Sequence, residues 1–166
     1  MRFIPDRCAG RRSRRPWAYD EDDGRGEAMQ VFRLADHQQF DRERHVEKIL
    51  GRIGAGDVSG DVSIACWEPG QISPYHCHPL ATEIYFCVEG GGVMNTPEGS
   101  AEIAPGAFVV HPPGELHEFA NGQERTLLFR VRYGSNMMAR LVAWRGRTDW
   151  VQTPEDREFF RKRPSP

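Results

Sequence analysis

From Val31 onward, apolar residues alternate with polar ones over short runs, and Gly, Pro or Asn separates most of these runs. Alternation with a period of two is typical of strands with one buried face, and frequent turn residues between short strands indicate a sandwich or barrel. No internal repeat is visible, so we expect one all-β barrel. The pattern predicts strands over residues 62–68, 83–89, 93–95, 100–103, 107–111, 117–120 and 126–133.

Several segments of the chain carry weaker signals. Residues 45–53 alternate too weakly to separate a strand from a helix, and we favour a strand. Residues 54–60 have turn chemistry, and Asp36 opens a capping-box pattern that predicts a short helical turn over residues 36–39. Residues 135–143 are a candidate for a further short helix.

The end of the chain carries a clearer helix signal. Thr153 is a good N-cap, Pro154 suits the first helical position, and acidic residues follow in the first turn. We therefore expect a terminal helix that runs to about Arg161.

The first 28 residues differ in composition from the rest of the chain. A block of arginines over residues 7–15 is followed by an acidic block at residues 20–23, without apolar periodicity. Such segments stay disordered, and a start codon assigned too far upstream would also account for this one. The predicted organisation is a disordered extension over residues 1–28, a barrel domain over 29–152, and a helix and tail over 153–166.

Composition limits the kinds of partner and compartment. The 166 residues carry a formal net charge of −2, which does not suggest a nucleic acid or a membrane surface as partner. No apolar run reaches the length of about 18 residues that a membrane-spanning helix needs. The four cysteines lack C-x-x-C spacing, and three fall within predicted strands, which favours a reducing cytoplasm.

Candidate metal ligands lie in two stretches of the chain. In the first, His76 and His78 would share one face of a strand because side chains alternate, while Cys77 points to the other face. Pro79 ends that strand, and the turn after it lets Glu83 begin the next strand near the same level. This stretch therefore offers two imidazoles and one carboxylate.

The second stretch adds His117 to the ligand set. Three neutral imidazoles and one carboxylate suit a divalent first-row transition metal such as Fe, Mn, Ni, Co, Cu or Zn, and do not resemble the oxygen ligands of Ca or Mg. Four protein ligands on an octahedral ion leave two positions for substrate, water or oxygen.

The spacing in both stretches resembles the two motifs of the cupin superfamily. Residues 70–90 read Gly, five residues, His-x-His, four residues, Glu, six residues, Gly. Residues 106–121 read Gly, five residues, Pro-x-Gly, two residues, His, three residues, Asn. Every fixed position of both motifs is filled. The resemblance implies a jelly-roll barrel around these residues, but no particular reaction, because this fold hosts unrelated chemistries.

Strand parity predicts which side chains surround the metal. Because an unpaired guanidinium is costly inside a barrel, we expect Arg130 and Arg132 to face outward and their apolar neighbours to face inward. With the opposite parity, the two arginines could bind a substrate carboxylate. Tyr85 is the candidate proton donor or oxygen ligand, and we expect His111 to have a structural or supporting role. The predicted pocket residues are Trp67, Tyr85, Cys87, Phe119, Phe129 and Val131.

These features favour a metal-dependent enzyme that acts on a small organic molecule. The resemblance to cupins implies a choice among several activities: oxygen-dependent cleavage, decarboxylation, isomerisation, lyase chemistry and non-catalytic ligand binding. We favour a dioxygenase-type reaction at Fe(II), with oxygen-independent chemistry at Mn, Ni or Zn as the alternative and a non-catalytic binding protein as the third reading. Ile84, Phe86 and Val88 would form an outward apolar row that needs a cover, and this predicts a homodimer.

Overall fold

The computed structural model describes residues 29–163. The extension predicted over residues 1–28 lies outside the described residues, as does the end of the tail. Among the residues described, no helix is long and apolar enough to cross a membrane. The elements, in chain order, are η1 (Leu34–Asp36), β1 (Val46–Ala55), β2 (Val58–Trp67), β3 (Tyr75–Cys77), β4 (Leu80–Glu89), β5 (Gly92–Thr96), β6 (Gly99–Ile103), β7 (Phe108–His111), β8 (Glu118–Asn121), β9 (Thr126–Asn136), β10 (Arg140–Ala143) and α1 (Pro154–Arg161).

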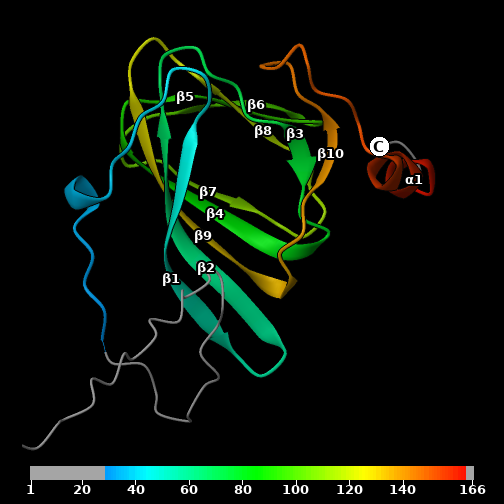
Figure 1. Cartoon of the computed structure of the whole chain (residues 1–166), viewed down its shortest axis with the longest axis horizontal. Helices are drawn as coiled ribbons and strands as arrows, with labels where there is room; N and C mark the ends of the chain where they lie inside the picture. Colours follow the sequence, from blue (N-terminus) through cyan, green and yellow to red (C-terminus); the bar gives the residue numbers. More distant parts are fainter. Residues whose placement is uncertain (1–28, 164–166) are drawn as a thin grey trace, which may run out of the picture. The chain divides into compact units, whose positions relative to one another are not determined.

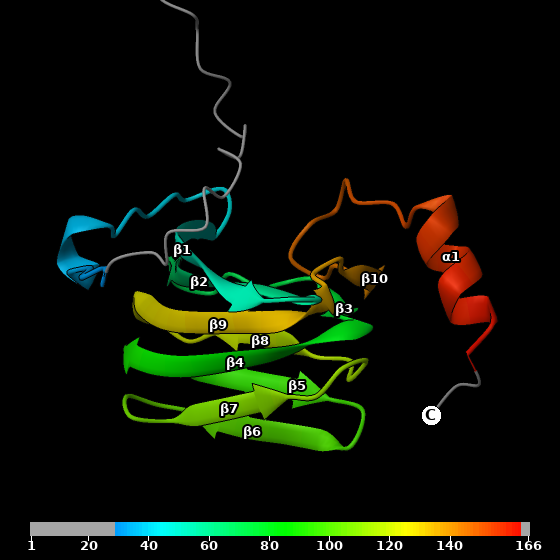
Figure 2. The same cartoon turned by 90° about the horizontal axis from the view of Figure 1, so that it is seen from below.

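Two groups of antiparallel strands face each other across a common interior (Figures 1 and 2). One group is a five-stranded sheet with the order β1-β2-β9-β4-β7. The other combines the three-stranded sheet β6-β5-β8 with the pair β10-β3, and single bridges at Ile72–Ala120 and His76–His117 connect the two parts. Ladder pairing is therefore not continuous around the barrel, but the predicted all-β jelly-roll fold is confirmed.

An apolar cluster at one end of the interior joins the two groups of strands. The five-stranded sheet supplies Trp67, Tyr85 and Leu128, and the opposite strands supply Met94 and Phe119. All of these side chains are almost fully buried. Full burial of a large apolar side chain stabilises a fold by roughly 1.5–3 kcal/mol, so this cluster is a main contributor to the packing of the two sheets.

The strand positions follow the alternation seen in the sequence. Residues 46–55 form a strand, as favoured over a helix, and β1 pairs with β2 through a turn at Gly56, whose φ of +60° suits glycine. That turn is shorter than the predicted one because both strands continue into residues 54–60. Pro79 separates β3 from β4, as predicted.

Two helical predictions were wrong, and one was right. Residues 135–143 contain the end of β9 and all of β10, because Leu141 pairs with His76 on β3 and tertiary pairing overrides local preference. The helical turn near Asp36 ends at that residue instead of beginning there; beyond it, the Gln39 amide donates to Cys66 Sγ on β2. The terminal helix α1 begins at Pro154 after the Thr153 cap, as predicted.

Candidate metal centre

His76 and His117 lie side by side because their backbones form an antiparallel bridge. The His76 amide donates to the His117 carbonyl over 3.0 Å, and the His117 amide donates to the His76 carbonyl over 2.8 Å. His78 follows two residues later on the same face, and Glu83 lies on the adjacent strand β4. The fold therefore brings candidate ligands from both cupin-like stretches into one buried region.

Each of the three imidazoles is oriented by a backbone carbonyl that faces its Nδ1 atom. A carbonyl only accepts hydrogen bonds, so Nδ1 carries the proton and Nε2 points toward the interior. Such contacts fix the ring orientation of metal-binding histidines. The acceptors are Pro74 for His76 (2.9 Å), Met137 for His78 (3.0 Å) and Glu115 for His117 (3.1 Å).

The Nε2 atoms of the three histidines face one oxygen, Glu83 Oε2. The distances to this oxygen are 2.9 Å from His117, 3.5 Å from His78 and 3.9 Å from His76. Ligands held about 2.1 Å from one ion are separated by about 3.0 Å in adjacent octahedral positions and by about 3.4 Å in a tetrahedron. The distances from Glu83 to His117 and to His78 therefore match those between neighbouring ligands of one first-row metal ion, and His76 lies somewhat farther out.

His78 is the least converged of the four side chains. The candidate ligand atoms of His76, Glu83 and His117 all lie within 4.8 Å of one another, and this set does not include His78. The His78 Nε2 atom also lies 3.5 Å from Nη1 of Arg132, at the outer limit of a hydrogen bond. The structure thus brings three predicted ligands together and places the fourth at the edge of the group.

Burial and local charges set the protonation of the ligands. Burial lowers the pKa of His76 to about 3, with a further contribution from His117, and burial also lowers the pKa of His78. Burial alone would raise the pKa of Glu83, but the contact with His117 and the charge on Arg130 bring it well below its usual value. At neutral pH, His76 and His78 are therefore neutral and Glu83 is ionised, which are the forms that bind metals.

Comparison with known proteins agrees with the fold and the motifs. Residues 63–131 match the family model of the cupin domain. This chain contains a cupin domain. No curated protein matches the chain. The matched region includes all four candidate ligands, His76, His78, Glu83 and His117. It also includes Gly90, the last fixed position of the first motif. Gly90 has a φ of +73°, and an added Cβ there would lie 2.2 Å from the Arg125 carbonyl oxygen, so the position requires glycine.

Solved structures with the same fold include several cupin-like proteins. A conserved protein with a double-stranded beta-helix domain from Klebsiella pneumoniae is 16% identical, with a TM-score of 0.61, over 69% of this chain and 98% of that one. KdgF from Halomonas sp. is 18% identical, with a TM-score of 0.54, over 64% and 96%. The DMSP lyase DddQ from Ruegeria pomeroyi is 23% identical, with a TM-score of 0.53, over 63% and 54%. At these identities, the similarity shows the fold alone.

The cupin interior also contains two arginines that we predicted to face outward. Arg130 is 3% exposed, and its Nη1 lies 2.7 Å from Glu47 and 3.5 Å from Glu83, while its Nε donates to Ser63 over 3.0 Å. Arg132 lies on the same face and donates to Asp61 over 2.9 Å. The prediction was wrong because these guanidiniums are not unpaired: carboxylates from β1, β2 and β4 neutralise them.

The same reversal moves two predicted pocket residues to the outer face. Phe129 packs with Leu34 and Phe40 from the segment before β1, and Val131 pairs with outward-facing Ile84 on β4. The predicted inward positions of these two residues were therefore wrong. A signal for the true parity was available: if Trp67 faces inward, Asp61 does too, and a buried carboxylate needs a cation. The other predicted pocket residues, Trp67, Tyr85, Cys87 and Phe119, lie together in the interior cluster.

His111 lies closer to the candidate ligands than its variable position in the motif suggested. Its ring stacks on that of His117, with centroids 3.8 Å apart and planes 9° from parallel. Its Nδ1 is 2.6 Å from Glu115 Oε2, and its buried Nε2 has no hydrogen-bond partner among the described residues. His111, on β7 opposite Glu83, therefore supports the orientation of His117 through this ring contact.

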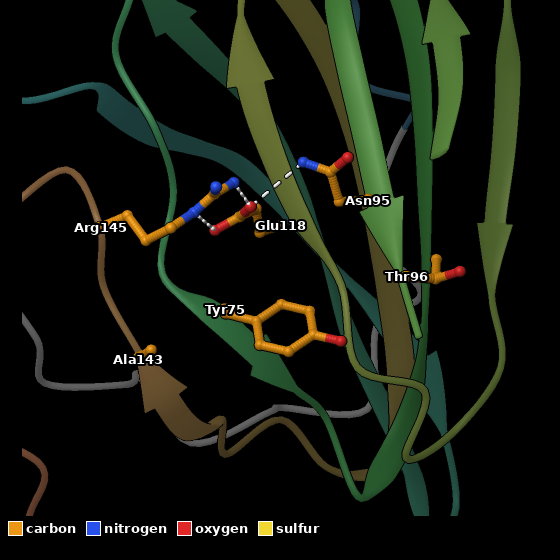
Figure 3. Close-up of a pocket in the computed structure, with 6 residues that line it drawn as sticks. All are labelled: Tyr75, Asn95, Thr96, Glu118, Ala143 and Arg145. Atoms are coloured by element: carbon orange, nitrogen blue, oxygen red, sulfur yellow. Dashed lines mark hydrogen bonds and ion pairs between the residues drawn. The ribbon is translucent and has the colours of Figure 1, made fainter. Parts of the chain in front are cut away.

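A separate cavity of about 440 Å³ lies behind the candidate metal centre (Figure 3). It is lined by Tyr75 and Glu118, which precede His76 and follow His117 and therefore point to the opposite side of their strands. Glu118 is paired there with Arg145 and accepts a hydrogen bond from Asn95. Figure 3 shows Glu118 in contact with Arg145 and Asn95, and none of the four candidate metal ligands lines this cavity, so it is not part of the metal centre.

Proposed function

We propose that this cupin is a metal-dependent enzyme that acts on a small organic molecule, with Fe(II)-dependent dioxygenation as its favoured reaction. The observation that carries the proposal is the arrangement of three imidazole Nε2 atoms around Glu83 Oε2. Four protein ligands leave two positions on a six-coordinate ion, enough for a substrate and oxygen together. A protein that only retains a ligand does not need a metal with exchangeable positions.

In this proposal, His76, His78, Glu83 and His117 hold the ion. When bound, the ion would supply Lewis acidity and, in the case of iron, redox chemistry with oxygen. Nearby apolar side chains exclude water from one side of the centre. Burial, followed by the charge on Glu83, raises the pKa of Tyr85 well above its usual value, so its hydroxyl stays protonated at neutral pH and keeps a proton to donate.

Oxygen-independent lyase, decarboxylase or isomerase chemistry at Mn, Ni or Zn is a second candidate. The position of Arg132 favours it, because a guanidinium 3.5 Å from the His78 ligand atom can stabilise an anion that develops next to the ion without any need for oxygen. The shared fold with a DMSP lyase is consistent with this alternative and does not select it.

Metal analysis of purified protein and of ligand variants tests the metal-binding part of the proposal. We expect about one first-row metal ion per chain, and we expect His117→Ala and Glu83→Gln to lose most of it. His37→Gln is the matched control, since His37 lies outside both motifs and should leave the metal content unchanged. Retention of metal by both ligand variants would contradict the proposed centre.

Oxygen consumption separates the candidate reactions. With Fe(II)-loaded protein and a panel of small organic acids, substrate-dependent oxygen uptake would support dioxygenation. Turnover at the same rate without oxygen would support the second candidate. Stoichiometric ligand binding without turnover under either condition would contradict an enzyme and favour a non-catalytic cupin.

We further propose that the protein is a homodimer in the cytoplasm. Leu34 and Phe40, from the segment before β1, cover only part of the outer face of the five-stranded sheet, while Phe86, Phe108 and Val110 remain 39%, 64% and 50% exposed. A two-fold contact through this row would bury it in the simplest closed assembly. A reducing compartment is supported by the three cysteines of the described chain, Cys66, Cys77 and Cys87, which are buried and free of disulfides.

A further inference from the structure

Arg132 lies next to the candidate metal centre, and only part of its hydrogen-bonding capacity is used there. It lies on β9, opposite Glu83 on β4 and opposite Asp61 on β2. One amino group, Nη2, donates to Asp61 Oδ2 over 2.9 Å. The Nε–H group is buried and has no hydrogen-bond partner among the described residues, and Nη1 has only the 3.5 Å contact with His78 Nε2.

Metal binding would weaken the last of these contacts. If His78 is a ligand, its Nε2 lone pair is directed to the ion and no longer accepts from Arg132. Two donor groups of the guanidinium are then without a partner inside the barrel. A buried charged group with unused donors costs free energy unless a ligand or water completes its hydrogen bonds.

Arg130 shows by contrast what a fully paired guanidinium looks like in the same interior. Its Nε donates to Ser63, and Nη1 lies 2.7 Å from Glu47. It also lies 3.5 Å from Glu83 and thereby supports a candidate ligand. Because its donors are occupied, Arg130 serves the structure, and Arg132 is the arginine that remains available to a ligand.

The charge balance of this interior depends on the metal. Three carboxylates, those of Glu47, Asp61 and Glu83, exceed the guanidiniums of Arg130 and the partly buried Arg132 by one negative charge. A divalent ion reverses the balance to an excess of one positive charge. The half-exposed side chain of Arg52 lies 3.8 Å from Asp61 at the rim, where water screens its charge, so it changes the balance of the interior little. The metal-loaded interior is therefore suited to one monovalent anion.

We propose that Arg132 and the metal ion together bind the carboxylate of a small organic acid, so that the substrates of this cupin are monocarboxylates. This inference rests on the proposed metal-dependent function. A planar carboxylate matches the planar donors of a guanidinium, and its single charge matches the excess in the interior, whereas a phosphate monoester would bring more negative charge than the site can balance.

The test compares acetate with its neutral analogue acetamide as probes. Cobalt(II)-loaded protein is titrated with each, and binding is followed by the visible absorption of the ion and by calorimetry. Metal content is measured first in every sample. We expect acetate to bind at least about tenfold more tightly than acetamide, and we expect metal-free protein to bind acetate at least about tenfold more weakly than the loaded protein.

Variants then assign the effect to Arg132. Arg132→Gln should keep its metal and weaken acetate binding by at least about tenfold, and Arg132→Lys should recover part of this loss because it restores the charge. Arg125→Gln, which alters an arginine paired with Glu68 on the surface, is the matched control and should bind acetate like the unaltered protein.

The outcomes separate this inference from the proposal on which it rests. A protein that takes up no metal contradicts both. A metal-loaded protein that binds acetate and acetamide equally, or an Arg132→Gln variant that keeps full acetate affinity, contradicts the carboxylate inference and leaves the metal centre in place. If Arg132→Gln does not fold, the comparisons of acetate with acetamide and of loaded with metal-free protein still decide the question.

Discussion

The two faces of the five-stranded sheet differ in a way that reverses the usual pattern. The inner face presents Glu83, Arg130 and Arg132 next to the candidate metal centre. The outer face of the same sheet presents apolar side chains, among them Phe86 on β4 and Phe108 on β7, which are 39% and 64% exposed. Over residues 129–132 of β9, Arg130 and Arg132 point in, while Phe129 and Val131 point out.

The interior that the inner face lines is itself divided into an apolar part and a charged part. Around Trp67 and Phe119 it is an ordinary apolar core that holds the sheets together. Around Glu83 it is a network of charges that is stable only as a complete set, since one missing partner leaves another charge buried and unpaired. The outer apolar row has no such network, and in our proposal a second chain covers it.

Loss of Arg130 should produce the largest effect on stability, because it would leave Glu47 and Glu83 without their cation. We expect Arg130→Met to lower the free energy of unfolding by about 3–5 kcal/mol in urea denaturation. The double variant Arg130→Met with Glu47→Gln should lose less, since one of the unpaired charges is removed. A loss below about 1 kcal/mol in the single variant would contradict the inward position of Arg130.

Acidification should destabilise the metal-free protein because a buried histidine in its interior, His76, is held in the neutral form. Burial lowers the pKa of His76 from 6.5 to about 3, so between these pH values the unfolded chain binds a proton that the folded chain does not. The free energy of unfolding should therefore fall as the pH decreases from about 6.5 toward 3. His76→Gln should reduce this slope in urea denaturation measured at successive pH values. An unchanged slope would show that His76 is not buried in neutral form.

Polar substitutions on the outer face should have the smallest effect on the fold and should act on assembly. Phe108→Ser with Val110→Ser should convert a dimer to a monomer in sedimentation experiments at micromolar concentration, while changing the stability of the folded chain by only about 0.5 kcal/mol. Val151→Ser removes an apolar residue that is 76% exposed elsewhere and is the control. A monomer before any substitution would contradict the proposed dimer.

Local signals in the sequence were sufficient for the strands and for the positions of the candidate ligands. Alternation placed His76 and His78 on one face, and Pro79 marked the break before the strand that carries Glu83. These features depend on residues close together in the chain. The helix α1 was predictable for the same reason, because its cap and first turn lie within four residues of each other.

The parity of β9 could not be predicted from that strand alone. Arg130 faces inward because Glu47 on β1 and Glu83 on β4 neutralise it, and these partners are distant in the sequence. In the same way, Leu141 belongs to a strand only because it pairs with His76 on β3. Where long-range pairing determines the structure, a rule based on one segment gives the wrong answer.

X-ray absorption at the edge of the bound metal reports directly on which atoms surround the ion. We predict one ion per chain, with about three imidazole nitrogens and at least one oxygen at roughly 2.0–2.2 Å, and one imidazole fewer in His78→Ala. An ion surrounded by oxygen alone, or imidazole scattering that is unchanged in His78→Ala, would contradict a centre built from His76, His78, Glu83 and His117.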